Sequence, residues 1–278
     1  MVYRAGIKKL LEEDLGTGDI TTELVVNGDV QAVGKVAAKE QCIVAGIQEA
    51  MELAMLRNLE LTAFIKEGQL AEAGKVILEL RGSAKEILIV ERLLLNLMSR
   101  MCSIATLTRE LVDLCRPVNP NVEIMATRKT TPGFRYYEKR AVEVGGGKAH
   151  RFALYDAVLI KDNHIQITGL QQAVTRAKKS SMPIEVEVED LEQARTALEA
   201  GADIIMLDNF SPADAKEAYD ELKSTDPNII IEVSGGITPK NIKDYAGAAD
   251  RISLGWLTHS IQSKDLSLEL VHLEGDRA

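Results

Sequence analysis

Residues 183–209 read PIEVEVEDLEQARTALEAGADIIMLDN, and this stretch decides the fold class. A β-branched run, PIEVEVE (183–189), is followed by a helical pattern at 190–200 and then by a second apolar run, DIIMLDN (203–209). Short apolar strands that alternate with helices are typical of parallel strands joined by crossover helices. The stretch therefore predicts an α/β fold with a parallel sheet.

The same alternation extends over residues 121–255. The other strand-like runs are VEIMAT (122–127), DAVLIKD (156–162), NIIIEVSGG (228–236) and RISLG (251–255). Helical patterns fall between or after the runs, at about 134–143, 168–180, 211–224 and 239–247. Repeated β–α units of this kind predict a barrel or a barrel-like sheet.

The N-terminal part of the chain has a different pattern. Residues 30–82 alternate short Val, Ile and Ala runs with Gly and Glu, which indicates a strand-rich module. Helices are expected at 3–13, 45–56 and 83–115. The chain thus has two regions of distinct character.

The composition excludes several classes of protein. The chain of 278 residues has a net charge of −9, a pI near 5.1 and only 4% aromatic residues, which argues against a nucleic-acid partner. We find no apolar run near the roughly 18–20 residues that span a bilayer, and no export signal. Three cysteines without CxxC spacing make a zinc site or a disulfide framework unexpected. We expect a cytoplasmic protein without a membrane partner.

Residues 127–164 form a cationic segment in this acidic chain. The segment has eight Lys or Arg and four acidic residues, a net charge of +4 that leaves −13 for the remainder. A confined positive region predicts a small anionic ligand rather than a long polyanion. The cations are Arg128, Lys129, Arg135, Lys139, Arg140, Lys148, Arg151 and Lys161.

Polar residues also end each predicted strand, although buried strands usually avoid them. Because the carboxyl ends of parallel strands converge on one face, these ends are expected to share a pocket. Glycine turns at Ser234-Gly235-Gly236 and at Gly255 suit a phosphate, since backbone N–H groups can approach it closely. The acids Glu187 and Asp208 could hold Mg²⁺, contact ribose hydroxyls or stabilise a cationic transition state; the alternative is an ion pair with nearby lysines.

Several motifs together resemble the quinolinate phosphoribosyltransferase family over nearly the whole chain. The most specific are TRKTTPGFR (127–135), EKRAVEVGGGKAHR (138–151) and LIKDNHI (159–165), in this order and spacing. Further matching segments are EDLGTGD (13–19), VERLLLN (90–96), SIATLTR (103–109), EVEVEDLEQA (185–194), LEAGADIIMLDN (198–209), SGGI (234–237) and LGWLTHS (254–260).

This resemblance implies a fold and a reaction. The implied fold is an N-terminal open α/β sandwich (1–104) followed by an incomplete α/β, TIM-like barrel (105–264), with 265–278 as a candidate to pack back on the first domain. The implied reaction converts quinolinate and phosphoribosyl pyrophosphate into nicotinate mononucleotide, CO₂ and pyrophosphate, in de novo NAD biosynthesis. A homodimer is the implied minimal unit, with a hexamer as the alternative.

The resemblance also assigns roles to residues. Quinolinate would be bound by Arg128, Lys129, His150, Arg151 and Lys161, and by Arg92 from a partner subunit. The phosphoribosyl group and its phosphate would meet Glu187, Asp208, Ser234, Gly235, Gly236, Gly255 and His259. Lys129, Lys161, Glu187 and Asp208 are the implied catalytic residues. Mg²⁺ would be held mainly by pyrophosphate and water, with Glu187 and Asp208 as candidate ligands.

The implied chemistry agrees with these residue types. Arginine matches the planar carboxylates of a dianion, and lysines offset charge on a departing pyrophosphate while carboxylates tolerate a cationic ribose. The chain departs from the family pattern at Ala149, Cys102-Ser103 and Trp256, none of which removes an expected charge.

Two alternatives remain open from the sequence. A nicotinate phosphoribosyltransferase, or a molybdenum-operon relative, would share the fold, but nicotinate has one carboxylate and the four cations Arg92, Arg128, Arg151 and Lys161 suit two. A non-catalytic barrel that binds a phosphometabolite would retain SGGI, but it has no need for Lys129, Glu187 and Asp208 together.

Overall fold

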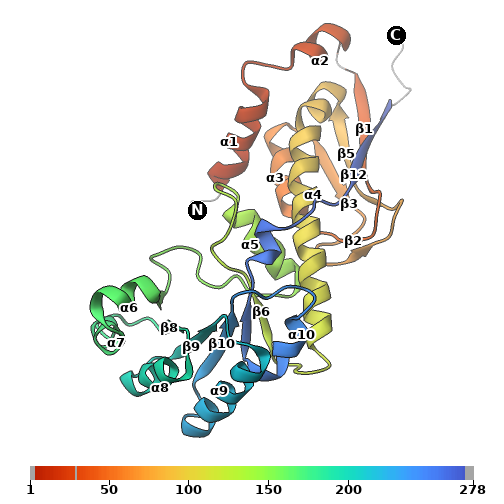
Figure 1. Ribbon diagram of the computed structural model, residues 1–278. Coiled ribbons are helices and arrows are strands. Elements are labelled where there is room, and N and C mark those ends of the chain that lie inside the picture. Colours follow the sequence, from red (N-terminus) through yellow and green to blue (C-terminus); the bar gives the residue numbers. More distant parts are fainter. Residues whose placement is uncertain (1–3, 29, 273–278) are drawn as a thin grey trace. The chain divides into compact units, whose positions relative to one another are not determined.

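The computed structural model describes residues 4–28 and 30–272, which form two compact units (Figure 1). The first unit comprises the described residues of Met1–Leu107, Tyr136–Gly145 and Ile261–Ala278, and the second comprises Thr108–Arg135 and Gly146–Ser260. The sequence predicts domain limits at 104 and 264. The observed first unit also includes Tyr136–Gly145, a segment from the middle of the chain.

An antiparallel sheet of four strands, in the order β12-β1-β5-β3, organises the first unit. The C-terminal strand β12 pairs with β1, with Val36 opposite Leu268, so a segment from the end of the chain completes this sheet. The strands are β1 (Gln31–Ala38), β3 (Glu60–Ala63), β5 (Val76–Ser83) and β12 (Leu266–His272), beside a small pair of β2 (Cys42–Ile43) and β4 (Leu70–Ala71).

The long helix α4 (Ala84–Cys115) contributes much of the first unit's core. Its buried side chains recur at helical spacing, at Ile87, Val90, Leu94 and Leu97. It packs closely on the sheet: a Cβ added to Gly34 of β1 would lie 2.8 Å from Ile87 Cγ2. The other helices of this part are α1 (Arg4–Leu15), α2 (Ile20–Val25), α3 (Ile47–Leu56) and α5 (Arg135–Gly145).

The second unit is built on a parallel sheet of six strands in the order β6-β11-β10-β9-β8-β7. Because β6 and β7 are the two edges, the barrel is open, which confirms the expected incomplete α/β barrel. The strands are β6 (Glu123–Met125), β7 (Val158–Ile160), β8 (Ile184–Val188), β9 (Ile204–Asp208), β10 (Ile230–Ser234) and β11 (Arg251–Ser253).

Local sequence signals explain the crossover helices of this sheet. Asp190 caps α8 (Leu191–Ala200) by accepting a hydrogen bond from Gln193 N, and Gly201 ends the helix with a φ of 86°. Ser211 caps the next crossover helix, with proline at its first position. The remaining helices are α6 (Asp162–Thr168), α7 (Leu170–Ala177), α9 (Pro212–Thr225), α10 (Ile242–Tyr245), the 3₁₀ turn η1 (Ala246–Ala248) and α11 (Trp256–His259).

Two predicted elements of this unit differ from the structure. The strand expected at 156–162 ends at Ile160, and α6 begins at Asp162, because the polar sequence KDNH turns into a helix. The helix expected at 239–247 is reduced to α10 and a 3₁₀ turn. Among the described helices, none is both long and apolar enough to cross a membrane.

Candidate active site

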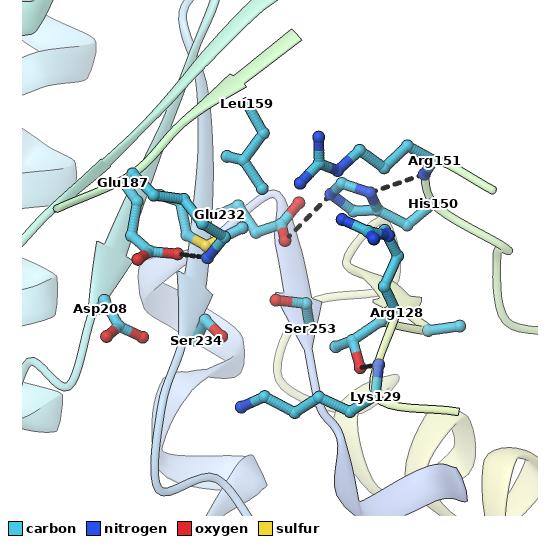
Figure 2. Close-up of a pocket in the computed structure, with 14 residues that line it drawn as sticks. Arg128, Lys129, His150, Arg151, Leu159, Glu187, Asp208, Glu232, Ser234 and Ser253 are labelled. Carbon is cyan, nitrogen blue, oxygen red and sulfur yellow. Dashed lines mark hydrogen bonds and ion pairs between the residues drawn. The ribbon is translucent and has the colours of Figure 1, made fainter. Parts of the chain in front are cut away.

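A pocket of about 420 Å³ opens at the carboxyl ends of the parallel strands, entirely within the second unit (Figure 2). Its lining comes from segments far apart in the sequence, as the strand-end argument predicts. The lining residues are Ala126, Thr127, Arg128, Lys129, His150, Arg151, Leu159, Lys161, Glu187, Met206, Asp208, Glu232, Ser234 and Ser253.

The strand register explains why these side chains share one face. Glu187 of β8 lies opposite Met206 of β9, and Asp208 of β9 lies opposite Ser234 of β10. Since side chains alternate across a strand, residues two apart point to the same side of the sheet. The alternate positions of three neighbouring strands therefore line the pocket.

One side of the pocket is cationic. In Figure 2, Arg128 and Arg151 lie together, opposite the acids of β8 and β9. Burial lowers the pKa of the Arg151 guanidinium, and the positive charge of Arg128 lowers it further. The buried Arg128 Nε has no hydrogen-bond partner among the described residues. Two adjacent guanidinium groups, one with an unpaired buried donor, are suited to bind an anionic group.

The opposite side of the pocket carries the acids. Glu187 forms an ion pair with Lys161, which lies directly before α6. Burial, followed by the charge of Glu187, raises the pKa of Asp208, although Lys161 and Lys129 lower it. The ion pair with a nearby lysine, which the sequence left open as the alternative to a ligand-binding role, therefore exists for Glu187. The carboxylate of Asp208 instead accepts a hydrogen bond from Asn209 Nδ2 at 2.7 Å.

Glycine turns flank this acidic side. Gly235 has a φ of 84°, and an added Cβ would lie 2.3 Å from Asn209 Oδ1, so only glycine fits there. An added Cβ on Gly255 would lie 2.8 Å from Lys129 Cδ and from His259 Cδ2. Both turns adjoin lining residues. The helix α10, which follows the first turn, has only four residues and offers little dipole for phosphate binding.

A buried cluster lies beneath the cationic side. His150 Nε2 lies 3.2 Å from Glu185 Oε2 and 3.5 Å from Glu232 Oε1. Burial alone lowers the pKa of His150, but hydrogen bonds with the two carboxylates outweigh burial and raise it to about 9. Burial and the charge of Glu232 raise the pKa of Glu185, although its hydrogen bond with His150 lowers it.

His150, Glu185 and Glu232 form one cluster of interacting groups. His150 Nδ1 accepts a hydrogen bond from the Arg151 N–H at 2.6 Å, so the ring proton lies on Nε2 and faces the carboxylates. The three ligand atoms lie within 4.8 Å of one another, and this is the group of possible metal ligands found among the described residues.

Comparison with known families decides the identity of the fold. The quinolinate phosphoribosyl transferase C-terminal domain matches residues 104–269, and the N-terminal domain of the same family matches residues 19–102. The chain belongs to the quinolinate phosphoribosyltransferase family.

Curated relatives of this family cover nearly the whole chain. A probable carboxylating nicotinate-nucleotide pyrophosphorylase from Methanocaldococcus jannaschii is 46% identical over 276 residues, which covers 96% of this chain and 97% of the relative. A carboxylating nicotinate-nucleotide pyrophosphorylase from Rattus norvegicus is 36% identical and covers 91% of this chain and 86% of the relative.

Solved structures agree with this assignment. The nicotinate-nucleotide pyrophosphorylase from Francisella tularensis has a TM-score of 0.88 at 38% identity and covers 95% of this chain and 94% of its own. Human nicotinic acid phosphoribosyltransferase has a TM-score of 0.62 at 12% identity, covering 98% of this chain and 74% of its own, so the likeness is one of fold alone. The similarity expected from the motifs is confirmed.

The structure brings together most of the site residues that the family resemblance implies. Eight of them line the pocket: Arg128, Lys129, His150, Arg151, Lys161, Glu187, Asp208 and Ser234. Gly235, Gly236 and Gly255 lie in the adjoining turns and His259 ends α11; none of the four is among the lining residues. Arg92 is exposed on α4 in the first unit.

Sequence reasoning missed one lining acid, one lining hydroxyl and a second acid beneath the pocket. Glu232 is fully buried and Ser253 is 2% exposed, while Glu185 lies beneath the pocket and is 2% exposed. A signal was present, since an acid within an apolar run such as IIIEV is unusual for a buried strand. Departures from the family pattern concern packing: Trp256 stacks edge-on against His259, and buried Cys102 Sγ contacts the backbone of Ala45.

Proposed function

We propose that this pocket transfers the phosphoribosyl group of phosphoribosyl pyrophosphate to the ring nitrogen of quinolinate, with loss of CO₂. The products are nicotinate mononucleotide, CO₂ and pyrophosphate, as family membership indicates. The observation that carries the proposal at this site is the separation of charge, with Arg128 and Arg151 on one side and Glu187 and Asp208 on the other.

The cationic side is proposed to bind quinolinate. Its two carboxylates match the adjacent guanidinium groups of Arg128 and Arg151, whose donors a planar carboxylate can accept in pairs. His150, beside Arg151, and Lys161, which pairs with Glu187 on the acidic side, are proposed to contribute further contacts to the carboxylates. Lys129 extends between the two sides (Figure 2). The dianion relieves the repulsion between the two arginines, because it places negative charge between them.

The acidic side is proposed to bind the phosphoribosyl group. As the bond from ribose C1′ to pyrophosphate breaks, the electron pair leaves with pyrophosphate and the ribose ring gains positive character, which Glu187 and Asp208 tolerate. Ser234 and the turns at Gly235, Gly236 and Gly255, with His259, are proposed to bind the 5′-phosphate through N–H and O–H donors.

Phosphoribosyl transfer and decarboxylation both depend on the ring nitrogen of quinolinate. Its new bond to C1′ makes the pyridine ring cationic, and the C–C bond to the neighbouring carboxylate then breaks with release of CO₂. The electron pair remains on the ring carbon, stabilised by the adjacent cationic nitrogen, until that carbon takes up a proton. The proposed work of Lys129 and Lys161 is to offset negative charge while the ligands are held in register.

Mg²⁺ is the proposed cofactor. Glu187 and Asp208 supply the oxygen ligands that this ion prefers, and the raised pKa of Asp208 reflects burial next to a like charge that a cation would offset. When bound with pyrophosphate, Mg²⁺ would neutralise charge on the leaving group.

A homodimer with a shared site is proposed as the working unit, with a hexamer as the alternative assembly. Arg92 is exposed, which suits a contact with a partner subunit. A mixture of Arg92→Ala and Arg128→Ala chains tests this, because a heterodimer would contain one site with both arginines intact. Activity should return on mixing if Arg92 acts across the interface, and a mixture as inactive as each parent would refute the shared site. The proposed location is the cytoplasm.

The test of function is product formation from quinolinate and phosphoribosyl pyrophosphate with Mg²⁺, with nicotinate in parallel. Nicotinate mononucleotide and CO₂ from quinolinate, without turnover of nicotinate, are the expected result. Turnover of nicotinate alone would assign the sister activity instead. No turnover of either, with retained binding of phosphoribosyl pyrophosphate, would favour a phosphometabolite-binding barrel.

A further inference from the structure

Two carboxylates are buried in the sheet at the pocket, where a charged group loses its hydration: Glu232 lines the pocket and Glu185 lies beneath it. The Glu185 side chain is 3% exposed and the Glu232 side chain 0%. They come from β8 and β10, on either side of β9. Glu185 lies opposite Ile204 of β9, and Glu232 lies opposite Met206, two residues further along. Because side chains two residues apart point to the same side of a sheet, both carboxylates face the same interior. Buried carboxylates persist only where a partner offsets their desolvation.

That partner is His150, which enters the sheet interior from the loop between α5 and β7. Its Nε2 is the donor nearest to both carboxylates, at 3.2 Å and 3.5 Å. The ring is also held from its other nitrogen, since Nδ1 accepts the Arg151 N–H. The His150 backbone has a φ of 52°, a left-handed conformation that is strained for a residue other than glycine.

A strained residue with both ring nitrogens engaged fixes the backbone around it. The next residue is Arg151, whose guanidinium lies beside Arg128 in the pocket (Figure 2). Regular pairing holds the loop at Lys148, which forms a parallel bridge with Met125. Beyond that bridge, the loop continues without a helix or strand to β7. The His150 side chain anchors the segment immediately before Arg151, and hydrogen bonds of Phe152 with Asp156 and Arg135 hold it immediately after.

We propose that Glu185 and Glu232 are positioning residues that lock His150, and that this lock keeps the Arg151 guanidinium beside Arg128 on the carboxylate-binding side. This inference rests on the proposed function, because Arg151 matters through its contact with quinolinate. The two acids act only through His150 and Arg151. They influence the half of the site that binds quinolinate and leave the phosphoribosyl half unaffected.

The first test compares Glu232→Gln and Glu185→Gln with native protein, with Glu192→Gln on the exposed surface of α8 as a matched control. We expect the KM for quinolinate to rise roughly 10-fold or more, because small displacements of a binding group have large effects. The KM for phosphoribosyl pyrophosphate should stay within about 2-fold. Equal changes in both constants, or no change in either, would overturn the proposal.

The decisive arm is a double-mutant cycle with Arg151→Ala. If the acids act through Arg151, Glu232→Gln should add almost nothing to the quinolinate KM of the Arg151→Ala variant. Independent, multiplying losses would overturn the proposal. A stoichiometric divalent ion that native protein retains and Glu232→Gln loses would also overturn it, since the cluster would then be a metal site.

Misfolding and failure of the proposed function give different results. Circular dichroism and thermal melting show whether each variant is folded, and calorimetric titration with quinolinate measures binding where turnover is lost. Should Glu232→Gln be unfolded, the cycle is completed with Glu185→Gln. Native protein in the same assay tests the proposed function itself, because no turnover of quinolinate would reject the activity. If native protein is active but the variants change the KM values for both substrates equally, only the positioning role is rejected.

Discussion

The two sides of the pocket use opposite charges and hold them in different ways. On the cationic side, Arg128 and Arg151 lie together and repel each other, and Arg128 Nε has no partner among the described residues. On the acidic side, Glu187 is already paired with Lys161, and Asp208 accepts a hydrogen bond from Asn209. In the part of the chain that the structure describes, the positive charge of the first side is therefore not offset by an ion pair with an acid, whereas the negative charge of the second side is partly neutralised by Lys161. The following predictions test that difference.

The largest expected effect is from Arg128→Ala on the cationic side. Removal of one partner of a buried charge contact costs about 2–5 kcal/mol, so kcat/KM for quinolinate should fall on the order of 10²–10³-fold. The KM for phosphoribosyl pyrophosphate should remain near native, as steady-state kinetics with each substrate varied in turn would show. A loss shared equally between the substrates would mean that the two sides do not act separately.

A smaller effect is expected from Glu187→Gln on the acidic side. This change frees Lys161 and removes a charge that raises the pKa of Asp208, so kcat should fall about 10–100-fold and the pKa of Asp208 should drop. Since the proposed role of Asp208 requires the carboxylate form, a lower pKa keeps it in that form to lower pH. The acidic limb of the kcat/KM profile should therefore move to lower pH, and a shift to higher pH would contradict the assignment.

A structural effect is expected at the glycine turn beside the acidic side. Gly235→Ala combines a φ of 84° with an added Cβ that meets Asn209, so it should lower the free energy of unfolding by about 2 kcal/mol or more and reduce activity. Gly74→Ala is the matched control, because its φ is 81° and nothing lies within 4 Å. Chemical denaturation should show a loss of about 1 kcal/mol for that control. Equal losses would mean that the contact with Asn209 is unimportant.

The smallest effect is expected for a charge outside the pocket. Lys216 and Asp220 form an exposed ion pair one turn apart on α9. Lys216→Ala should change the free energy of unfolding by about 0.5 kcal/mol or less and leave both KM values unchanged. A marked change in either KM would show that a distant surface charge affects substrate binding. The changes predicted for the pocket variants could then not be assigned to one side of the pocket.

The sequence predicted the sheet because its signals are local. Apolar runs such as 203–209 and caps such as Asp190 depend on neighbouring residues, and the structure confirms the parallel sheet they imply. The start of α6 at Asp162 was missed because the strand run and the polar KDNH segment have no glycine or proline between them. Local patterns identify an element more securely than its ends.

The candidate site was predictable where a charge ended a strand. Lys161, Glu187 and Asp208 stand at such ends, and the pocket brings them together. Glu185 and Glu232 lie inside their strands, so recognising them requires the register that places both beside β9 and the loop that delivers His150. Those are long-range relations, which no short window of sequence contains.

The central claim is that the cationic side binds both carboxylates of quinolinate. The most direct measurement is calorimetric titration of quinolinate and of nicotinate into native protein, repeated with Arg128→Ala. Because a hydrogen bond to a charged group is worth about 1.5–3 kcal/mol, quinolinate should bind native protein roughly 10–100-fold more tightly than nicotinate, and Arg128→Ala should remove most of that difference. Equal affinity for the two ligands in native protein would contradict the claim.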